Sequence, residues 1–139
     1  MPSELNQSSM VSETPPRPAV LIADDDAAIL KLVTAIVQAE GYEVVAANDG
    51  KQAYKLLQSN HQIRAVIVDI RMPYIEGTEL LRFMRSNERF SHIPVIVMTA
   101  GTDPKATSSS FNAGAAAFLS KPFTNSQLRL MLKTVLDSR

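Results

Sequence analysis

The run Val20-Leu21-Ile22-Ala23-Asp24-Asp25 decides the fold of this chain. Its four apolar residues lead straight into two carboxylates, and three further segments repeat this arrangement of a short, mainly apolar run before a polar group. These segments are Val66-Ile67-Val68 before Asp69, Val95-Ile96-Val97-Met98 before Thr99, and Ala117-Phe118-Leu119-Ser120 before Lys121-Pro122. Short apolar runs are typical of strands buried on both faces, and such strands build parallel sheets.

The polar groups that follow these runs are expected to meet. Parallel strands all end at one edge of their sheet, and open α/β sheets place their ligand sites at this carboxyl edge. If the four strands are neighbours, Asp24, Asp25, Asp69, Thr99 and Lys121 converge there. This convergence of three carboxylates, a hydroxyl and an ammonium group is the main indication of function.

Segments with helical spacing of apolar residues lie between the strands, so the chain is predicted to be α/β with five strand-then-helix repeats. The expected strands are 20–23, 42–47, one that ends at 69, 93–98 and 117–120. The expected helices run from the cap Asp26 to Gly41, from the turn Asn48-Asp49-Gly50 to Asn60, from Gly77 to Asn87, from Asp103-Pro104 to Gly114, and onward from the capping box Thr124 and Gln127.

Three of these helices carry specific expectations. The run Thr107-Ser108-Ser109-Ser110 has weak helix propensity, so the fourth helix is expected to be the least stable. On the last helix, Leu130 lies off the apolar stripe and is a candidate exposed contact. The first helix is expected to face the core through Ile29, Leu32, Val33, Ile36 and Val37.

The composition excludes several classes of function. With 139 residues, the chain is long enough for one domain with a proper core. Fourteen acidic and fourteen basic residues cancel, so the sequence shows no electrostatic footprint for nucleic acid or for an anionic lipid surface. The absence of cysteine excludes disulfides, thiolate chemistry and cysteine-bound metals. No apolar stretch reaches membrane-spanning length and no signal-peptide pattern is present, so a soluble cytoplasmic protein is expected.

Two sets of basic residues are interpreted as surface. Arg82, Arg85 and Arg89 share a helical face and are expected to be solvated rather than to bind phosphate. His61 and His92 lie in loops outside every motif and are expected to be plain surface residues.

Residues 1–18 are predicted to be a disordered tail. Four prolines and four serines, with few apolar side chains, cannot offset the entropy of ordering. Residues 19–139 form the single predicted domain. Because the chain ends just after its last helix, we expect it to carry no DNA-binding or enzymatic output domain and to act through a separate protein.

The carboxylate cluster predicts a magnesium site. Three carboxylates drawn together repel one another unless a cation joins them. An oxygen-only cluster suits a hard ion, and Mg²⁺ takes about six oxygen ligands at roughly 2.1 Å. One divalent ion and Lys121 balance the three negative charges, and such a site can accept a phosphoryl group. Asp69 is the predicted nucleophile because it stands alone at its strand end, whereas the adjacent Asp24 and Asp25 suit a metal-holding pair.

Four segments resemble the signature motifs of response-regulator receiver domains of two-component signalling. They are Leu21–Asp26 (LIADDD), Val66–Pro73 (VIVDIRMP), Val97–Ala100 (VMTA) and Lys121–Phe123 (KPF). The resemblance covers nearly all of residues 19–139. It implies a flavodoxin-like, doubly wound sheet of five parallel strands in the order 2-1-3-4-5. It also implies a stand-alone signalling switch that catalyses its own aspartyl phosphorylation and dephosphorylation, rather than a metabolic enzyme.

By this resemblance, Asp69 is the phosphoacceptor. Asp25 and Asp69 would bind Mg²⁺ directly, together with the backbone carbonyl of Arg71, and Asp24 would act through a metal-bound water. Lys121 would pair with a phosphoryl oxygen. The implied donor is a phosphohistidine on a histidine kinase or a histidine phosphotransfer protein.

The resemblance also implies a conformational switch. Thr99 would move to hydrogen-bond the phosphoryl group, and Phe118 occupies the position of the family's switch aromatic, without the hydroxyl of the frequent tyrosine. The responding face is expected to be the fourth helix, last strand and last helix, and to control an effector protein that the sequence does not identify. The protein is expected to be a monomer or a phosphorylation-dependent dimer. Arg71 and Gly101 lie two residues beyond Asp69 and Thr99, at positions that tune phosphoryl lifetime.

Other interpretations stay open at this point. A haloacid-dehalogenase-like phosphatase would use Asp24 and Asp26, but it needs acidic ligands downstream of its lysine, and only Asp137 follows Lys121. A flavodoxin-like flavin binder needs a phosphate-cradling loop where this chain has three aspartates. A phosphorelay intermediate, or a degenerate receiver that is a phosphorylation-independent binding module, would share the fold. The complete acidic, Thr99 and Lys121 positions argue against the degenerate receiver.

Overall fold

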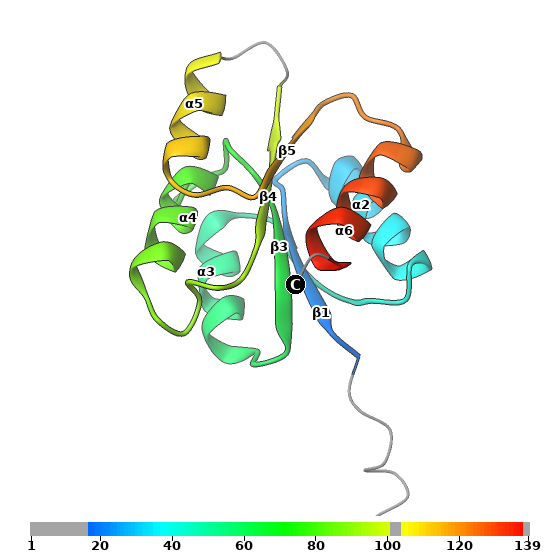
Figure 1. Cartoon of the computed structure of the whole chain (residues 1–139), viewed down its shortest axis with the longest axis horizontal. Helices are drawn as coiled ribbons and strands as arrows, with labels where there is room; N and C mark the ends of the chain where they lie inside the picture. The colour runs from blue at the N-terminus through cyan, green and yellow to red at the C-terminus, as the bar shows by residue number, and fades with distance from the viewer. Residues whose placement is uncertain (1–16, 101–103, 138–139) are drawn as a thin grey trace, which may run out of the picture.

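The computed structural model describes residues 17–100 and 104–137. Within them, five parallel strands form one sheet in the order β2-β1-β3-β4-β5, which confirms the predicted flavodoxin-like α/β class (Figure 1). The strands are β1 (Ala19–Ala23), β2 (Glu43–Ala47), β3 (Ile63–Asp69), β4 (Val95–Thr99) and β5 (Ala117–Ser120). The helices are α2 (Ala27–Ala39), α3 (Gly50–Ser59), α4 (Gly77–Ser86), α5 (Pro104–Asn112) and α6 (Asn125–Asp137).

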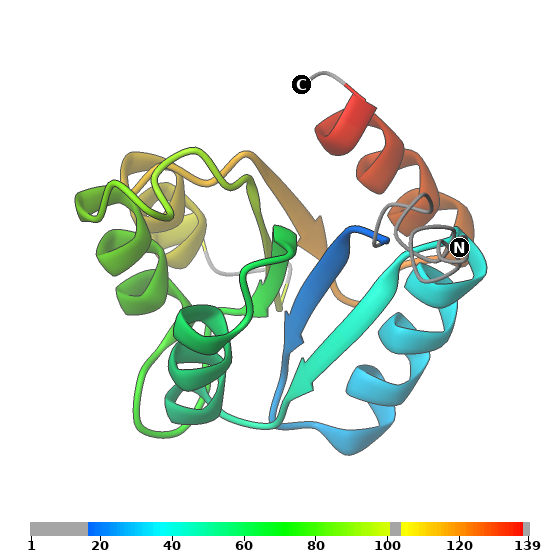
Figure 2. The ribbon, with the colours of Figure 1, turned by 90° about the horizontal axis from the view of Figure 1, so that it is seen from below.

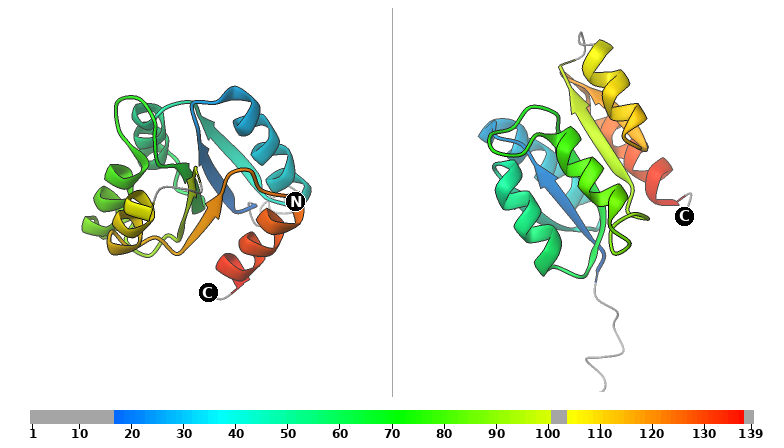
Figure 3. Two further views of the ribbon diagram at one scale, coloured as in Figure 1. Left: turned by 90° about the horizontal axis from the view of Figure 1, so that it is seen from above. Right: turned by 90° about the vertical axis from the view of Figure 1, so that its left-hand side faces the viewer.

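The sheet lies between two layers of helices. α2 and α6 cover one face (Figures 1 and 2), and α3, α4 and α5 lie side by side on the other (Figure 3). Alternate residues of a strand point to opposite faces. β1 therefore sends Val20 and Ile22 into the core under α2 and α6, and Leu21 and Ala23 into the core under α3 and α4. All four are fully buried, which explains why this strand is apolar without alternation.

The described helix starts confirm two predicted caps. Asp26 caps α2, because its Oδ1 accepts hydrogen bonds from the backbone N–H groups of Ala28 and Ile29, at 2.9 and 3.3 Å. Thr124 and Gln127 form the predicted capping box at the start of α6. Gln127 Oε1 accepts from the Thr124 N–H at 2.8 Å, and Thr124 Oγ1 accepts from the Gln127 N–H at 3.1 Å.

Other boundaries refine the prediction. Asp49, expected in a turn, is the N-cap of α3 and accepts from the Gln52 N–H at 2.7 Å, while Gly50 already belongs to the helix. Gly41 and Gly114 follow α2 and α5 with φ angles of 97° and 101°, a backbone conformation that favours glycine. Asp103, the expected cap of α5, lies outside the described residues.

The expected core position of Leu32 is wrong. Its side chain is 41% exposed, because the buried stripe of α2 consists of Val33, Ile36 and Val37. Leu32 lies about 100° around the helix from Val33, on the flank that faces solvent. Leu130, in contrast, is 67% exposed, as its place off the stripe of α6 predicted.

The expected solvated face of three arginines is only partly confirmed. Arg82 and Arg89 are exposed, but Arg85 is half-buried. The Arg85 guanidinium joins α4 to the segment before β4 and to the segment before β5. It donates to the backbone carbonyls of Ser91 at 3.1 Å, Ile93 at 2.9 Å and Gly114 at 3.2 Å. Sequence spacing gives no sign of these partners, since all lie beyond the helix.

α5 carries a buried polar group within its serine run. Ser110 is fully buried, and its hydroxyl finds no hydrogen-bond partner within the described residues. An unpaired buried hydroxyl costs about 1–3 kcal/mol. This burial adds a second reason for low stability of α5, although the ranking of the helices stays a prediction.

Residues 17 and 18 are the described part of the predicted tail. The Glu43 N–H donates to the Pro18 carbonyl at 3.1 Å, and Arg17 pairs with the Glu43 side chain at 3.6 Å on the surface. The last two residues of the predicted tail are thus tied to the first residue of β2. Residues 1–16 lie outside the described residues. Among the described helices, none has the length and apolar character needed to cross a membrane.

Candidate functional site

The carboxyl ends of four strands bring the predicted polar residues to one edge of the sheet. Asp24 follows β1, Asp69 ends β3, Thr99 ends β4 and Lys121 follows β5. The register keeps these ends level, with the pairs Ala23–Val68, Asp69–Met98 and Thr99–Ser120. The predicted convergence at the carboxyl edge is therefore confirmed.

Asp24, Asp25 and Asp69 form an acidic cluster. One carboxylate oxygen from each lies within 4.8 Å of the others. Asp24 is fully buried, Asp69 is partly buried and Asp25 is exposed. The buried Asp24 is held in place by its Oδ1, which accepts a hydrogen bond from the Asp26 N–H at 2.9 Å. Asp26 is outside this cluster, and its carboxylate is used to cap α2.

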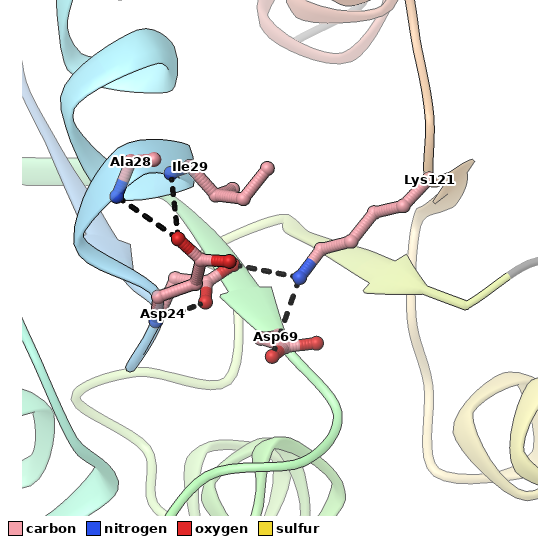
Figure 4. A network of polar contacts seen from close by, with 6 residues as sticks. Asp24, Ala28, Ile29, Asp69 and Lys121 are labelled. Atoms are coloured by element: carbon pink, nitrogen blue, oxygen red, sulfur yellow. Dashed lines mark hydrogen bonds and ion pairs between the residues drawn. The ribbon is translucent and has the colours of Figure 1, made fainter.

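Lys121 bridges two members of the cluster (Figure 4). Its Nζ lies 2.9 Å from Asp24 Oδ2 and 3.4 Å from Asp69 Oδ2. Its backbone N–H donates to the Thr99 carbonyl at 2.8 Å, so the end of β4 fixes the base of the side chain. Burial by itself lowers the pKa of Lys121, but the hydrogen bond to Asp24 and the charges of Asp69 and Asp24 outweigh it, and the pKa is raised.

Asp69 is the carboxylate whose environment opposes ionisation. Burial raises the pKa of Asp69 most strongly, and the neighbouring charge of Asp24 raises it further. Lys121 acts in the opposite direction without cancelling these effects. Three carboxylates and one ammonium leave an excess of negative charge, which a further cation bound at the cluster would offset.

The donor set fits a hard divalent cation. The cluster offers carboxylate oxygens without histidine or cysteine, and the oxygens are close enough for one ion to contact more than one of them. Mg²⁺ prefers oxygen ligands and keeps several waters, which the exposed side at Asp25 allows. The arrangement can therefore hold a cation beside a carboxylate and an ammonium group, which are the parts needed for phosphoryl transfer.

Comparison with known proteins agrees with this geometry. Residues 20–133 match the family model of the response regulator receiver domain. The chain belongs to this family. Chemotaxis protein CheY1 of Helicobacter pylori is 30% identical over 120 residues, which make up 86% of this chain and 97% of that protein. A response regulator receiver domain protein (CheY-like) from Methanospirillum hungatei superposes with a TM-score of 0.81 at 31% identity, covering 88% of this chain and 96% of that chain.

Receiver domains also occur within longer proteins. The CAI-1 autoinducer sensor kinase/phosphatase CqsS of Vibrio cholerae is 35% identical over 104 residues, which make up 74% of this chain and 15% of the kinase. Membership places the chain in two-component phosphorelay signalling, where receiver domains are switches that interact with histidine kinases and downstream effectors and bind Mg²⁺ at an acidic pocket. The phosphatase and flavin-binding interpretations are thereby set aside.

The remaining predicted residues lie on β4, on β5 and in the segments that follow β3 and β4. Thr99 is buried at the end of β4. Phe118 pairs with Val97 in the sheet and is half-buried, and its ring centroid lies 6.4 Å from that of Phe111 on α5. Arg71 is exposed, two residues beyond Asp69, whereas Gly101 lies outside the described residues. The Lys121-Pro122 peptide bond is cis.

Sequence reasoning missed one residue that shapes the receiver site. A Cβ added to Gly77, the first residue of α4, would lie 2.3 Å from the Asp69 carbonyl oxygen. The Gly77 N–H donates to the carbonyl of Ile70 at 2.8 Å, which draws the start of α4 against the end of β3. A glycine that opens a helix was visible in the sequence, but the neighbour that it faces was not.

Proposed function

We propose that this receiver domain accepts a phosphoryl group on Asp69 from a phosphohistidine donor, with Mg²⁺ bound at the acidic cluster. The observation that supports the proposal best is the Lys121 ammonium, which lies between buried Asp24 and partly buried Asp69. In this assignment, Asp25, Asp69 and the backbone carbonyl of Arg71 would hold the ion directly, and Asp24 would act through a water. When bound, Mg²⁺ supplies positive charge that offsets the carboxylates and the phosphoryl oxygens.

In the proposed reaction, a carboxylate oxygen of Asp69 attacks the phosphorus atom. The new O–P bond forms as the P–N bond to the donor imidazole breaks, and the electron pair of that bond stays on the ring nitrogen, which takes up a proton from solvent. Lys121 neutralises charge on a phosphoryl oxygen, and the Thr99 hydroxyl donates to another. Hydrolysis of the aspartyl phosphate by water releases inorganic phosphate, returns Asp69 to its carboxylate and completes the switch cycle.

Intact-mass measurement after incubation with Mg²⁺ and acetyl phosphate tests this proposal. The wild-type protein is expected to gain one phosphoryl group, and the Asp69→Asn variant is expected to gain none. Asp26→Asn is the matched control, because Asp26 caps α2 and stands outside the cluster. Phosphorylation that persists in Asp69→Asn, or that is unaffected when EDTA removes the metal, would contradict the assignment.

We also propose that phosphorylation alters the face formed by α5, β5 and α6, and that this face controls an effector protein. Phe111 and Leu130 are each 67% exposed there, and a groove of about 540 Å³ runs between β5 and α6, lined by residues that include Phe118, Leu130 and Met131. The Phe111–Phe118 ring contact links α5 to the switch position. A change at Thr99 can thus reach α5 through the adjacent strand β5 and Phe118.

Amide hydrogen exchange of the phosphorylated and the unphosphorylated protein tests this switch proposal. Phosphorylation is expected to change amide exchange in residues 104–131, and the Asp69→Asn protein under the same conditions should show no change. Unaltered amide exchange over these residues in fully phosphorylated wild-type protein would refute the switch proposal. The proposal that Asp69 accepts a phosphoryl group would be unaffected by that result.

Arg71 is proposed to set the lifetime of the aspartyl phosphate. Its side chain is exposed two residues beyond Asp69, where it can contact the phosphoryl group or shield it from water. The Arg71→Asn variant is therefore expected to lose the phosphoryl group at a different rate from the wild type, followed by mass after removal of the donor. Equal rates would remove this role. Gly101 is proposed to act at the equivalent position after Thr99.

A further inference from the structure

The hydroxyl of Ser110, on α5, is buried without a hydrogen-bond partner among the described residues. The other buried polar side chains in the described part of the chain, which are those of Asp24, Thr78 and Thr99, do not share this lack. A serine hydroxyl has one donor and two acceptor sites, and water satisfies them when the side chain is exposed. The present position of α5 therefore carries a free-energy cost at Ser110.

α5 has little apolar burial that could offset this cost. Among the α5 residues whose side chains the structure describes, Ser110 alone is buried, and Phe111 is 67% exposed. The run of Thr107 to Ser110 also has weak helix propensity. Elements that move in switching proteins are drawn from the less stable parts of a fold. The one core-facing position of this helix is thus taken by a polar group.

The C-terminal end of α5 is fixed. The Gly114 N–H donates to the Phe111 carbonyl at 3.0 Å, and the Ala115 N–H donates to the Ser110 carbonyl at 3.1 Å. These two hydrogen bonds form a Schellman motif, which ends the helix. Arg85 Nε, from α4, also donates to the Gly114 carbonyl at 3.2 Å. This end of the helix can therefore serve as a pivot.

The side of α5 is attached to α4 more weakly. The two helices are neighbours on one face of the sheet (Figure 3). Between them, Arg82 donates to the Ser109 hydroxyl at 3.3 Å, and this hydrogen bond is exposed to solvent. A long, exposed hydrogen bond contributes little to stability, because water can replace either partner. Rotation of α5 about its C-terminal end would therefore break little.

We propose that the buried Ser110 hydroxyl raises the free energy of the unphosphorylated arrangement of α5 and so makes the helix easier to switch. The proposal rests on the proposed function, in which phosphorylation of Asp69 alters α5. A pivot about the end held by Arg85 gives the hydroxyl access to water or to a carbonyl group, so its cost is removed in the switched arrangement. Ser110 needs no contact with the phosphoryl group to shift this equilibrium.

The size of the effect follows from the cost of an unpaired buried hydroxyl. Alanine at this position removes that cost from the unphosphorylated arrangement, which changes its equilibrium with the switched arrangement by a factor of about five. The apparent affinity of a ligand that requires the switched arrangement falls with the populated fraction of that arrangement. The Ser110→Ala variant is therefore expected to bind a mimic of the phosphoryl group roughly fivefold more weakly than the wild type.

Calorimetric titration of the full chain with trifluoroberyllate, an anion that resembles a phosphoryl group, tests this expectation at saturating Mg²⁺. Two further measurements need neither metal nor mimic: Ser110→Ala should raise the urea midpoint and slow amide exchange in residues 104–112. Ser108→Ala is the matched control, because Ser108 is exposed in the same run of the helix. It gains the same helix propensity, so its stability should rise while its affinity for trifluoroberyllate equals that of the wild type.

Four outcomes would overturn the proposal. Equal affinity of Ser110→Ala and the wild type for trifluoroberyllate would refute it while phosphoryl acceptance stands. Equal weakening by Ser110→Ala and Ser108→Ala would mean an effect of helix propensity. A urea midpoint of Ser110→Ala below that of the wild type would mean that the hydroxyl is paired. A wild-type protein that binds no trifluoroberyllate and gains no phosphoryl group would refute the proposed function and this proposal together.

Discussion

The substitution Gly77→Ala is predicted to damage the phosphorylation site through the backbone. The added Cβ would lie 2.3 Å from the Asp69 carbonyl oxygen, 3.0 Å from the Asp69 carbonyl carbon and 3.1 Å from the Ile70 Cα. Ordinary contacts of a Cβ begin at 3.4 Å, so the end of β3 and the start of α4 must separate by about 1 Å. The contacts are all with backbone, which has no flexible side chain to swing away.

The cost follows from this required movement. Overpacking of this kind destabilises a protein by roughly 1–3 kcal/mol. Because Asp69 itself moves, we also expect its phosphorylation by acetyl phosphate to slow by about 10- to 100-fold, as misplacement by 1 Å does at reactive centres. Urea unfolding measures the first effect, and the initial rate of phosphorylation, followed by intact mass, measures the second.

Gly41→Ala is the matched control for this prediction. A Cβ on Gly41 meets nothing within 4 Å, but its φ of 97° makes alanine strained by about 1–2 kcal/mol. Both variants should lose stability, and only Gly77→Ala should lose phosphorylation rate. If Gly77→Ala is phosphorylated as fast as Gly41→Ala, the argument that the glycine positions Asp69 is refuted.

Three further predictions concern the charges of the site and α5. Lys121→Met leaves buried Asp24 without its ammonium partner and should lower the free energy of unfolding, measured by urea titration, by about 3 kcal/mol. Adding Asp24→Asn should recover part of this loss. An unchanged urea midpoint in Lys121→Met would contradict the prediction. Ser110→Ala removes a buried hydroxyl without a partner among the described residues and should raise the unfolding free energy by about 1 kcal/mol, whereas a loss of stability would show that the hydroxyl is used. Because the pKa of Asp69 is raised in the folded state, the metal-free fold binds a proton more tightly than the unfolded chain does. The stability of the wild type should therefore rise relative to Asp69→Asn as pH falls through this raised pKa, and urea midpoints at a series of pH values that show the opposite slope would refute the assigned environment.

The sequence predicted those features that depend on neighbours along the chain. The apolar runs before Asp24 and Asp69 predicted buried parallel strands, and Asp26 predicted the start of α2. Both features depend on residues that are consecutive in the sequence, because a strand buried on both faces is continuously apolar and a helix cap bonds to the next few N–H groups. The convergence at the carboxyl edge followed from the common direction of parallel strands. The strand order, in contrast, came from the resemblance to receiver domains, since periodicity does not tell which strands are neighbours.

The errors and omissions have one cause, which is contact between elements that lie far apart in the sequence. Helical spacing could not tell that Leu32 lies at the exposed flank of α2 or that Arg85 reaches three carbonyls outside α4. The gathering of His61 and Arg89 at one cavity, beside the end of α3 and the start of β3, also depends on how these segments pack. None of these contacts leaves a pattern among residues that are close together in the sequence.

The amino-acid sequence by itself thus determined the parallel strands, most helix starts and the identity of the polar groups at the carboxyl edge. Tertiary structure decided the 2.9 Å approach of Lys121 to Asp24, the contact of Gly77 with the Asp69 backbone and the burial of Ser110. The physical reason is that strand burial and helix caps are set by short-range periodicity and hydrogen bonding. Distances between side chains of separate elements are fixed only when the two helical layers close on the sheet.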